Sequence, residues 1–81
     1  MNLSEKKQIQ HPDDLVVDNR YSVLIPDNGK LKRMQGRFLH METHYTQTED
    51  KPRRPHLVIL LVRATDTLVI DWKQAKDWRE L

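Results

Sequence analysis

The stretch from Leu57 to Trp72, LVILLVRATDTLVIDW, constrains the fold of this chain more than any other. Two short apolar runs, rich in β-branched residues, flank a polar break over residues 63–66. Each run is too short for a typical helix, and its residue types favour a pleated, half-buried surface. The stretch therefore predicts two antiparallel strands in the middle of a small sheet.

The chain has 81 residues, which suffices for one domain. It contains no cysteine, which excludes disulfides, thiolate metal ligands and cysteine nucleophiles and favours a reducing compartment, the cytoplasm. The polar N-terminus does not resemble a secretory signal. The longest apolar run, Leu57 to Val62, is too short to span a membrane, so no membrane partner is expected.

The N-terminal part of the chain is polar and is interrupted by His11-Pro12. Because such terminal segments pack weakly, residues 1–14 are predicted to form a flexible arm, and residues 15–81 the folded domain. The first apolar residues of that domain, 15–17, are interpreted as a short edge strand or a packed loop.

A hairpin is predicted next. Tyr21 to Ile25 has the alternation of a strand with one buried face. The following Pro26-Asp27-Asn28-Gly29 combines residues that preset or tolerate turn geometry, and it is the strongest turn signal in the chain. The return strand, Leu31 to about Glu42, is unusual because its apolar side chains switch between odd and even positions. A bend or bulge at Gly36 explains that switch and favours a small barrel, closed or nearly closed, over a flat sheet.

The rest of the chain is predicted as alternating loops and strands. His44 to His56 contains two prolines and is interpreted as a long polar loop. Leu57 to Val62 is predicted to be a central strand, and Leu68 to Trp72 its neighbour. Lys73 to Trp78 is predicted to form one helical or 3₁₀ turn, after which residues 78–81 close the barrel.

These expectations give a mainly β fold: a small, strongly bent antiparallel barrel of four or five strands. In strand order and turn chemistry, the region from Leu15 to Leu81 resembles the Sm-like and SH3-like small barrels. No signature motif of either group occurs in the sequence, so no binding residue is carried over from them. The resemblance implies a module that binds single-stranded nucleic acid.

Charge is the best functional indicator in the sequence. Residues 1–28 carry a net charge of −2, residues 29–63 of +5 and residues 64–81 of −1. A basic surface with an exposed aromatic ring is typical of proteins that bind single-stranded nucleic acid, because phosphates attract cations and bases stack on rings. The alternative interpretation is a solvated charged face that keeps a small protein soluble. The candidate nucleic-acid-binding residues are Lys30, Lys32, Arg33, Arg37, Tyr45, Lys51, Arg53 and Arg54.

A second candidate surface lies near the C-terminus. Trp78 and its neighbour Arg79 have the residue types that dominate binding energy in protein interfaces. A terminal amphipathic segment is expected to leave Trp78 half exposed and available to a protein partner. The competing interpretation is that a core this small needs the tryptophan for its own packing.

Other chemistry finds little support. His40 and His44 flank Glu42, but on a strand their backbones lie about 13 Å apart, too far to share one ion, so no metal site is predicted. No arrangement of nucleophile, acid and base stands out, and two glycines cannot build a phosphate-cradling loop. We therefore expect no catalytic residues and no cofactor.

The resulting hypothesis is a binding or regulatory module that contacts nucleic acid, or a nucleoprotein complex, through a basic hairpin and loop. The alternative hypothesis is an adaptor or inhibitor that binds a protein partner through an edge strand or the Trp78 face. Association of identical copies through exposed edges is compatible with both hypotheses.

Overall fold

The computed structural model describes residues 8–48 and 50–81, with the side chains at 47, 48 and 51 outside that description. Within it the chain forms one antiparallel sheet in the order β4-β3-β2-β1-β5, preceded by a single 3₁₀ turn. The elements are η1 (Pro12–Asp14), β1 (Arg20–Asp27), β2 (Lys30–Thr48), β3 (Lys51–Val62), β4 (Thr67–Asp71) and β5 (Lys76–Glu80).

The β1–β2 hairpin turns at Asn28 and Gly29, as the sequence predicts. Asp27 pairs with Lys30, so only two residues form the turn. Both have positive φ, 51° for Asn28 and 77° for Gly29. This is the geometry that matches the right-handed twist of the flanking strands, and Asn-Gly is the dipeptide that adopts it most readily.

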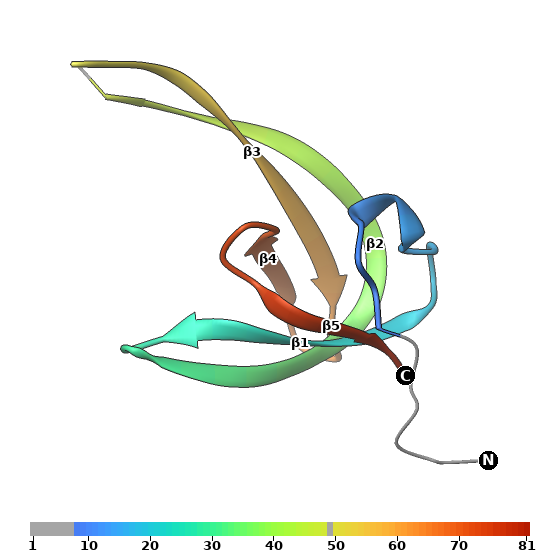
Figure 1. The fold of residues 1–81 in the computed structure, drawn as a ribbon. Coiled ribbons are helices and arrows are strands. Elements are labelled where there is room, and N and C mark those ends of the chain that lie inside the picture. The colour runs from blue at the N-terminus through green and yellow to red at the C-terminus, as the bar shows by residue number, and fades with distance from the viewer. Residues whose placement is uncertain (1–7, 49) are drawn as a thin grey trace.

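The long strand β2 bends and changes partner, which confirms the predicted bend near Gly36. Its residues up to 37 pair with β1, and its residues from 37 onward pair with β3, with a register shift between Phe38 and His40. A Cβ atom on Gly36 would lie 2.7 Å from the Cβ of Leu61. The close approach of β2 and β3 therefore requires a residue without a side chain. Figure 1 shows β2 as one long curved strand that continues from the β1–β2 hairpin into the hairpin with β3.

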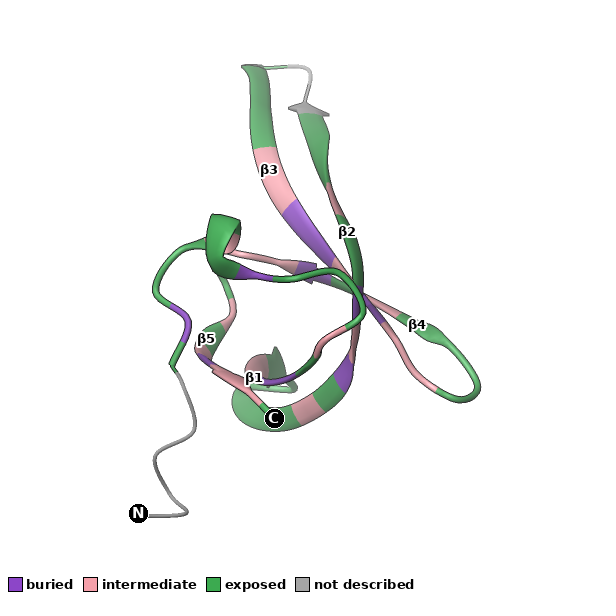
Figure 2. Ribbon diagram, turned by 90° about the vertical axis from the view of Figure 1, so that its right-hand side faces the viewer, coloured by how far each residue is buried: buried purple, intermediate pink, exposed green. Residues whose placement is uncertain are grey.

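The core fills the inside of this curve. Tyr21 and Phe38 meet edge to face with ring centroids 6.4 Å apart, and Trp72 stacks on Trp78 at 5.4 Å. Figure 2 shows the buried residues spread along the central strands and the segment before η1. The buried apolar residues are Ile9, Leu15, Tyr21, Val23, Phe38, Val58, Ile59, Leu61, Ile70 and Trp78.

The central strands predicted from residues 57–72 are confirmed. β3 pairs with β4 in an antiparallel register that sets Ile59 opposite Ile70 and Leu61 opposite Leu68. These apolar pairs are the cross-strand contacts that stabilise a sheet. The connecting loop is closed by a hydrogen bond of 2.8 Å from the Arg63 N–H to the carbonyl of Asp66.

The barrel expected from the sequence is only partly formed. The sheet has five antiparallel strands and is strongly bent, but its outer strands, β4 and β5, are not paired with each other. The predicted mainly β, strongly bent antiparallel fold is confirmed, but the sheet is not closed into a barrel. β5 pairs with β1 instead, and its own outer edge receives the segment before η1: Gln8 bridges to Arg79, and the Ile9 N–H donates to the carbonyl of Trp78 at 2.8 Å.

That contact also bears on the expected N-terminal arm. Residues 1–7 lie outside the described residues. Gln8 and Ile9 pair with β5, and Ile9 is only 5% exposed. The boundary drawn at Leu15 thus excludes a residue that belongs to the core. Residues 15–17 form a loop in which Leu15 alone is buried.

The loop predicted over residues 44–56 is wrong as well. β2 and β3 continue as a projecting hairpin as far as Thr48 and Lys51, and Figure 1 shows it extending away from the rest of the sheet. The two prolines fit because β4 pairs only with residues 58–62 of β3, which leaves the earlier residues a free edge where no N–H is needed. We call residues 44–48 and 51–56 the ribbon.

The helical or 3₁₀ turn predicted for residues 73–78 is displaced and shorter. The N–H groups of Gln74 and Ala75 donate to the carbonyl of Asp71 at 3.2 and 3.1 Å, which closes a single turn over residues 71–75, and residues 76–78 belong to β5. In β5 only Trp78 points into the core. A strand explains why one buried residue lies between two charged neighbours, because successive side chains of a strand point to opposite faces.

Candidate functional site

Four of the predicted nucleic-acid-binding residues lie on the first half of β2, where alternation divides them between the two faces of the strand. Lys32 lies opposite Ile25, which packs against the core, so Lys30 and Lys32 share the core-facing side. Arg33 and Arg37 lie on the opposite face. The structure therefore does not bring these four cations onto one surface.

Arg33 holds β5 against the first hairpin. Its guanidinium donates to the Ser22 hydroxyl at 2.6 Å and pairs with the carboxylate of Asp77, which also accepts a 2.9 Å bond from Arg79. Hydrogen bonds from Arg79 and from Arg33 lower the pKa of the Asp77 carboxyl. Asp77 has a positive φ of 55°, at the register shift between β1 and β5. We call this network of Ser22, Arg33, Asp77 and Arg79, which joins β5 to the first hairpin, the clamp.

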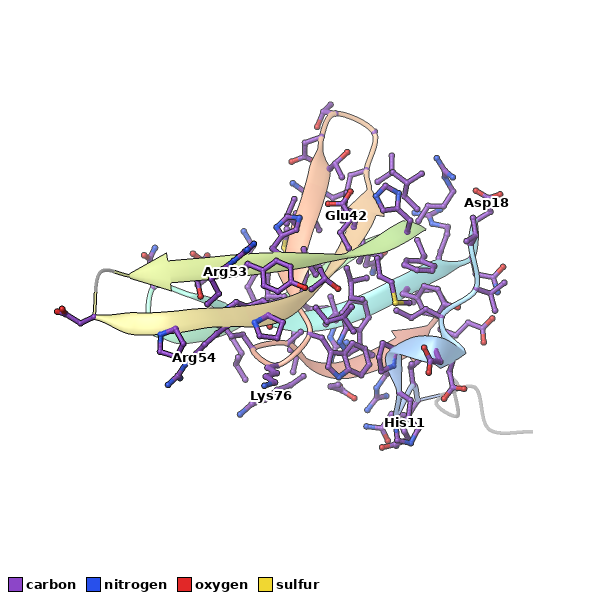
Figure 3. All side chains as sticks on the ribbon, turned by 90° about the horizontal axis from the view of Figure 1, so that it is seen from above. His11, Asp18, Glu42, Arg53, Arg54 and Lys76 are labelled. Carbon is purple, nitrogen blue, oxygen red and sulfur yellow. The ribbon has the colours of Figure 1, made fainter. Side chains whose placement is uncertain are left out.

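Arg37 pairs with Asp18, which lies in the loop before β1. Arg37 is seven residues from Lys30, about 23 Å along an extended strand. In Figure 3, Asp18 is labelled at the opposite end of the molecule from Arg53 and Arg54. The eight predicted residues are thus distributed over separate parts of the molecule and do not form one patch.

The ribbon carries Tyr45, Arg53 and Arg54 from the predicted set, and all three are exposed. The guanidinium carbon of Arg53 lies 4.5 Å from the ring centroid of Tyr45, whose side chain is 55% exposed. Arg54 lies opposite Thr46 and, by alternation, on the other face of the ribbon from Arg53. Neither arginine forms an ion pair with a carboxylate of the described residues. The side chain of Lys51 lies outside the description.

Histidines and carboxylates gather at the base of the ribbon. Glu42 accepts hydrogen bonds from His40 at 2.7 Å and from His44 at 2.8 Å, and these two bonds, with that from His44 the stronger influence, lower the pKa of its carboxyl. His56 lies opposite His44 and contacts Asp71 at 3.1 Å. Although their backbones are far apart, both imidazoles of the His40–His44 pair reach the same carboxylate. Among the described residues no group of three such side chains is arranged to hold a metal ion.

The expectation that Trp78 is half exposed is wrong. Its side chain is 3% exposed and stacks on Trp72, and its indole N–H is buried without a partner among the described residues. Arg79 is engaged with Asp77. Whether this region binds a protein stays an untested prediction, but any such contact would involve the surface of β5 and not the indole.

Sequence reasoning missed one group of cations. Arg20 lies opposite Arg37, and these two arginines line a hollow together with Arg63. The sequence did contain the necessary information. With a two-residue turn at 28–29, each residue of β1 lies opposite the residue of β2 for which the two residue numbers add up to 57. Arg20 and Arg37 satisfy that sum.

Comparison of the chain with protein-family models, with curated proteins and with solved structures found no match. In the described part of the chain, no helix has the length and apolar character needed to cross a membrane. The functional argument therefore depends on the geometry of this molecule alone.

Proposed function

We propose that this protein is a non-catalytic module that binds single-stranded nucleic acid through the ribbon. The observation that carries the proposal is the exposed stack of Arg53 on Tyr45, on a hairpin that extends away from the core. A flat aromatic ring beside a guanidinium offers a base both a stacking surface and a nearby cation for its phosphate. The bent five-stranded sheet is compatible with the fold-level resemblance to Sm-like and SH3-like small barrels.

The ribbon suits side-chain contacts better than strand pairing. Pro52 and Pro55 remove backbone donors from its free β3 edge, and Arg53 and Arg54 place charges beside them. Prolines and charges on an edge discourage pairing with another strand. The ribbon's two faces are then left for a ligand that recognises planar and cationic side chains.

The first hairpin supplies a second contact in this proposal. Figures 1 and 3 show the tips of both hairpins on the same side of the molecule. Lys30 and Lys32 are exposed near the tip of the first hairpin and form no ion pair with a carboxylate of the described residues. A flexible strand that stacks on Tyr45 would find these lysines as phosphate partners.

Fluorescence anisotropy with labelled 12-nucleotide strands of DNA and RNA, and with the matching duplexes, tests the proposal at two salt concentrations. We expect saturable binding of single strands that weakens as salt rises, because phosphate contacts release counterions. Tyr45→Ala should weaken binding about tenfold, the loss of one stacked base, while Tyr45→Phe retains it.

A matched pair of double variants locates the contact. Arg53→Gln/Arg54→Gln removes two charges from the ribbon. Lys73→Gln/Lys76→Gln removes two exposed charges elsewhere, one in the turn before β5 and one at the first residue of β5. The proposal requires a clear loss of affinity in the first variant only. Equal losses in both, preference for duplexes, or no binding at low salt would contradict it.

A specific observation also favours the protein-interaction alternative. The edge of β4 carries neither proline nor lysine, and Val69 on this strand is 61% exposed. The edge of β5, in contrast, is covered by Gln8 and Ile9. An extended segment of a protein partner could add to β4 as a further strand, and a second copy of this chain is the simplest such partner. Light scattering should then show association that Val69→Lys abolishes; a monomer at every concentration removes the self-pairing form of this alternative.

A further inference from the structure

A shallow hollow of about 500 Å³ lies where β1, β2 and the loop after β3 meet. Three arginines from three different segments line it, and none of its lining residues carries a carboxylate. The lining residues are Arg20, Gln35, Gly36, Arg37, Val62, Arg63 and Ala64.

Register explains why Arg20 and Arg37 lie side by side at the hollow, and the end of β3 brings Arg63 to its edge. Arg20 lies directly opposite Arg37 on the neighbouring strand, and Arg37 lies opposite Val62 on the strand beyond. Arg63 follows Val62 at the end of β3. Like charges set directly opposite each other destabilise a strand pair, so the Arg20–Arg37 pair has an unfavourable energy that a bound anion would relieve.

Two of the arginines are held in place from outside the hollow. Asp18 binds Arg37, and Asp66 binds Arg63 through both of its carboxylate oxygens. Neither aspartate lines the hollow, and each arginine keeps unused N–H donors. Arg20 forms no ion pair with any carboxylate of the described residues. The site thus combines two guanidiniums positioned by ion pairs with a third, that of Arg20, which forms none, and guanidiniums bind oxyanions well.

We propose that this hollow is a binding site for a phosphate group, held by the guanidiniums of Arg20, Arg37 and Arg63. Arginine forks match the spacing of phosphate oxygens, and the amide of Gln35 adds a neutral donor at the rim. The hollow is open and shallow, so the phosphate belongs to a larger molecule whose remainder stays in solvent. Either a small phosphorylated compound or the terminal phosphate of an oligonucleotide supplies this chemistry.

This site is independent of the ribbon. Figure 3 places Asp18, the partner of Arg37, at the end of the molecule away from Arg53 and Arg54. Phosphate binding in the hollow therefore does not depend on nucleic-acid binding at the ribbon. Either proposal can fail while the other holds.

Backbone amide NMR tests the site at low ionic strength. Pyrophosphate, a 5′-phosphorylated hexanucleotide and the same hexanucleotide without its phosphate are titrated into the protein. We expect saturable shifts at the amides of Gly36 and Ala64 with every ligand that carries a terminal phosphate. Shifts with pyrophosphate identify a small phosphorylated compound as sufficient, and shifts with the phosphorylated hexanucleotide alone assign the site to an oligonucleotide end.

Substitutions complete the test. Arg20→Gln should weaken the binding about tenfold or more, the loss of a charge-assisted hydrogen bond, and Arg37→Gln should act similarly. Lys73→Gln, which removes an exposed charge elsewhere, should leave it unchanged. Tryptophan fluorescence confirms that each variant is folded. Absent shifts, shifts spread evenly over all cationic regions, or equal effects of Arg20→Gln and Lys73→Gln would overturn the proposal.

Discussion

Replacing Gly36 by alanine should destabilise the protein, because β3 leaves no room there for a side chain on β2. The new Cβ would lie 2.7 Å from the Cβ of Leu61 and 3.2 Å from the carbonyl oxygen of Val62. Both of these atoms belong to a rigid part of β3, so no side-chain rotation relieves the contact. The strands must separate where β2 changes partner.

Two opposing effects set the magnitude. Alanine restricts the unfolded chain and would by itself stabilise the protein by about 0.4–1 kcal/mol. Overpacking in a core costs about 1–3 kcal/mol, and a contact with the Cβ of Leu61 belongs at the upper end of that range. The net expectation is a loss of about 2 kcal/mol, which lowers Tm by about 8–16 °C in a domain of this size.

Urea denaturation followed by tryptophan fluorescence measures this loss, since Trp72 and Trp78 are stacked in the core. Gly29 provides a matched control in which a loss of stability would come from backbone strain and not from packing. A Cβ at Gly29 meets no atom within 4 Å, but the φ of this residue is +77°. Gly29→Ala should cost about 1 kcal/mol and Gly29→Asn much less, because asparagine tolerates that conformation. An unchanged or raised midpoint for Gly36→Ala would refute the packing argument.

Three further predictions concern the core and the ion pairs. Trp78→Ala should cost about 3–5 kcal/mol in urea unfolding and Trp78→Phe far less, since the indole N–H has no partner to lose; equal losses would contradict the stacking account. Asp77→Asn, which tolerates the positive φ, should cost about 1 kcal/mol by weakening the bonds from Arg33 and Arg79, and an unchanged midpoint would argue against the clamp. The pKa of the Glu42 carboxyl is lowered on folding, so its contribution to stability is present above its ordinary pKa and is lost as pH falls through the folded pKa. Below pH about 5, the free energy of unfolding of the wild type should therefore fall more steeply with pH than that of Glu42→Gln. Parallel plots of unfolding free energy against pH would exclude this contribution.

Local patterns predicted much of this fold. The apolar runs around residues 63–66 form the β3–β4 pair, and Asn28-Gly29 forms the first turn, because both features depend on neighbouring residues alone. The switch in apolar face along β2 likewise indicated the bend near Gly36. In each case periodicity and turn chemistry agree with the final packing.

The errors arose where an interpretation needed to know which strands are neighbours. Pro52 and Pro55 are ordinary signals of a loop, but they are tolerated here because β4 does not extend alongside them. The exposure of Trp78 could not be inferred without knowing that β5 returns beside β1. Closure of the sheet depends similarly on long-range geometry.

The candidate site illustrates the same limit. A net charge of +5 over residues 29–63 is a property of the sequence, but alternation sends Lys32 and Arg33 to opposite faces, and ion pairs occupy Arg33 and Arg37. Charge density along a chain therefore overestimates charge density on a surface. Arg20 shows the converse, because only the register reveals its position opposite Arg37.

The salt dependence of single-strand binding tests the role of the ribbon most directly. Each phosphate contact contributes about 0.7 to the slope of log K against log salt for a single strand. If Arg53 and Arg54 both contact phosphates, Arg53→Gln/Arg54→Gln should reduce the magnitude of that slope by about 1.4, while Lys73→Gln/Lys76→Gln leaves it as in wild type. Identical slopes for wild type and the ribbon variant would contradict the proposed function.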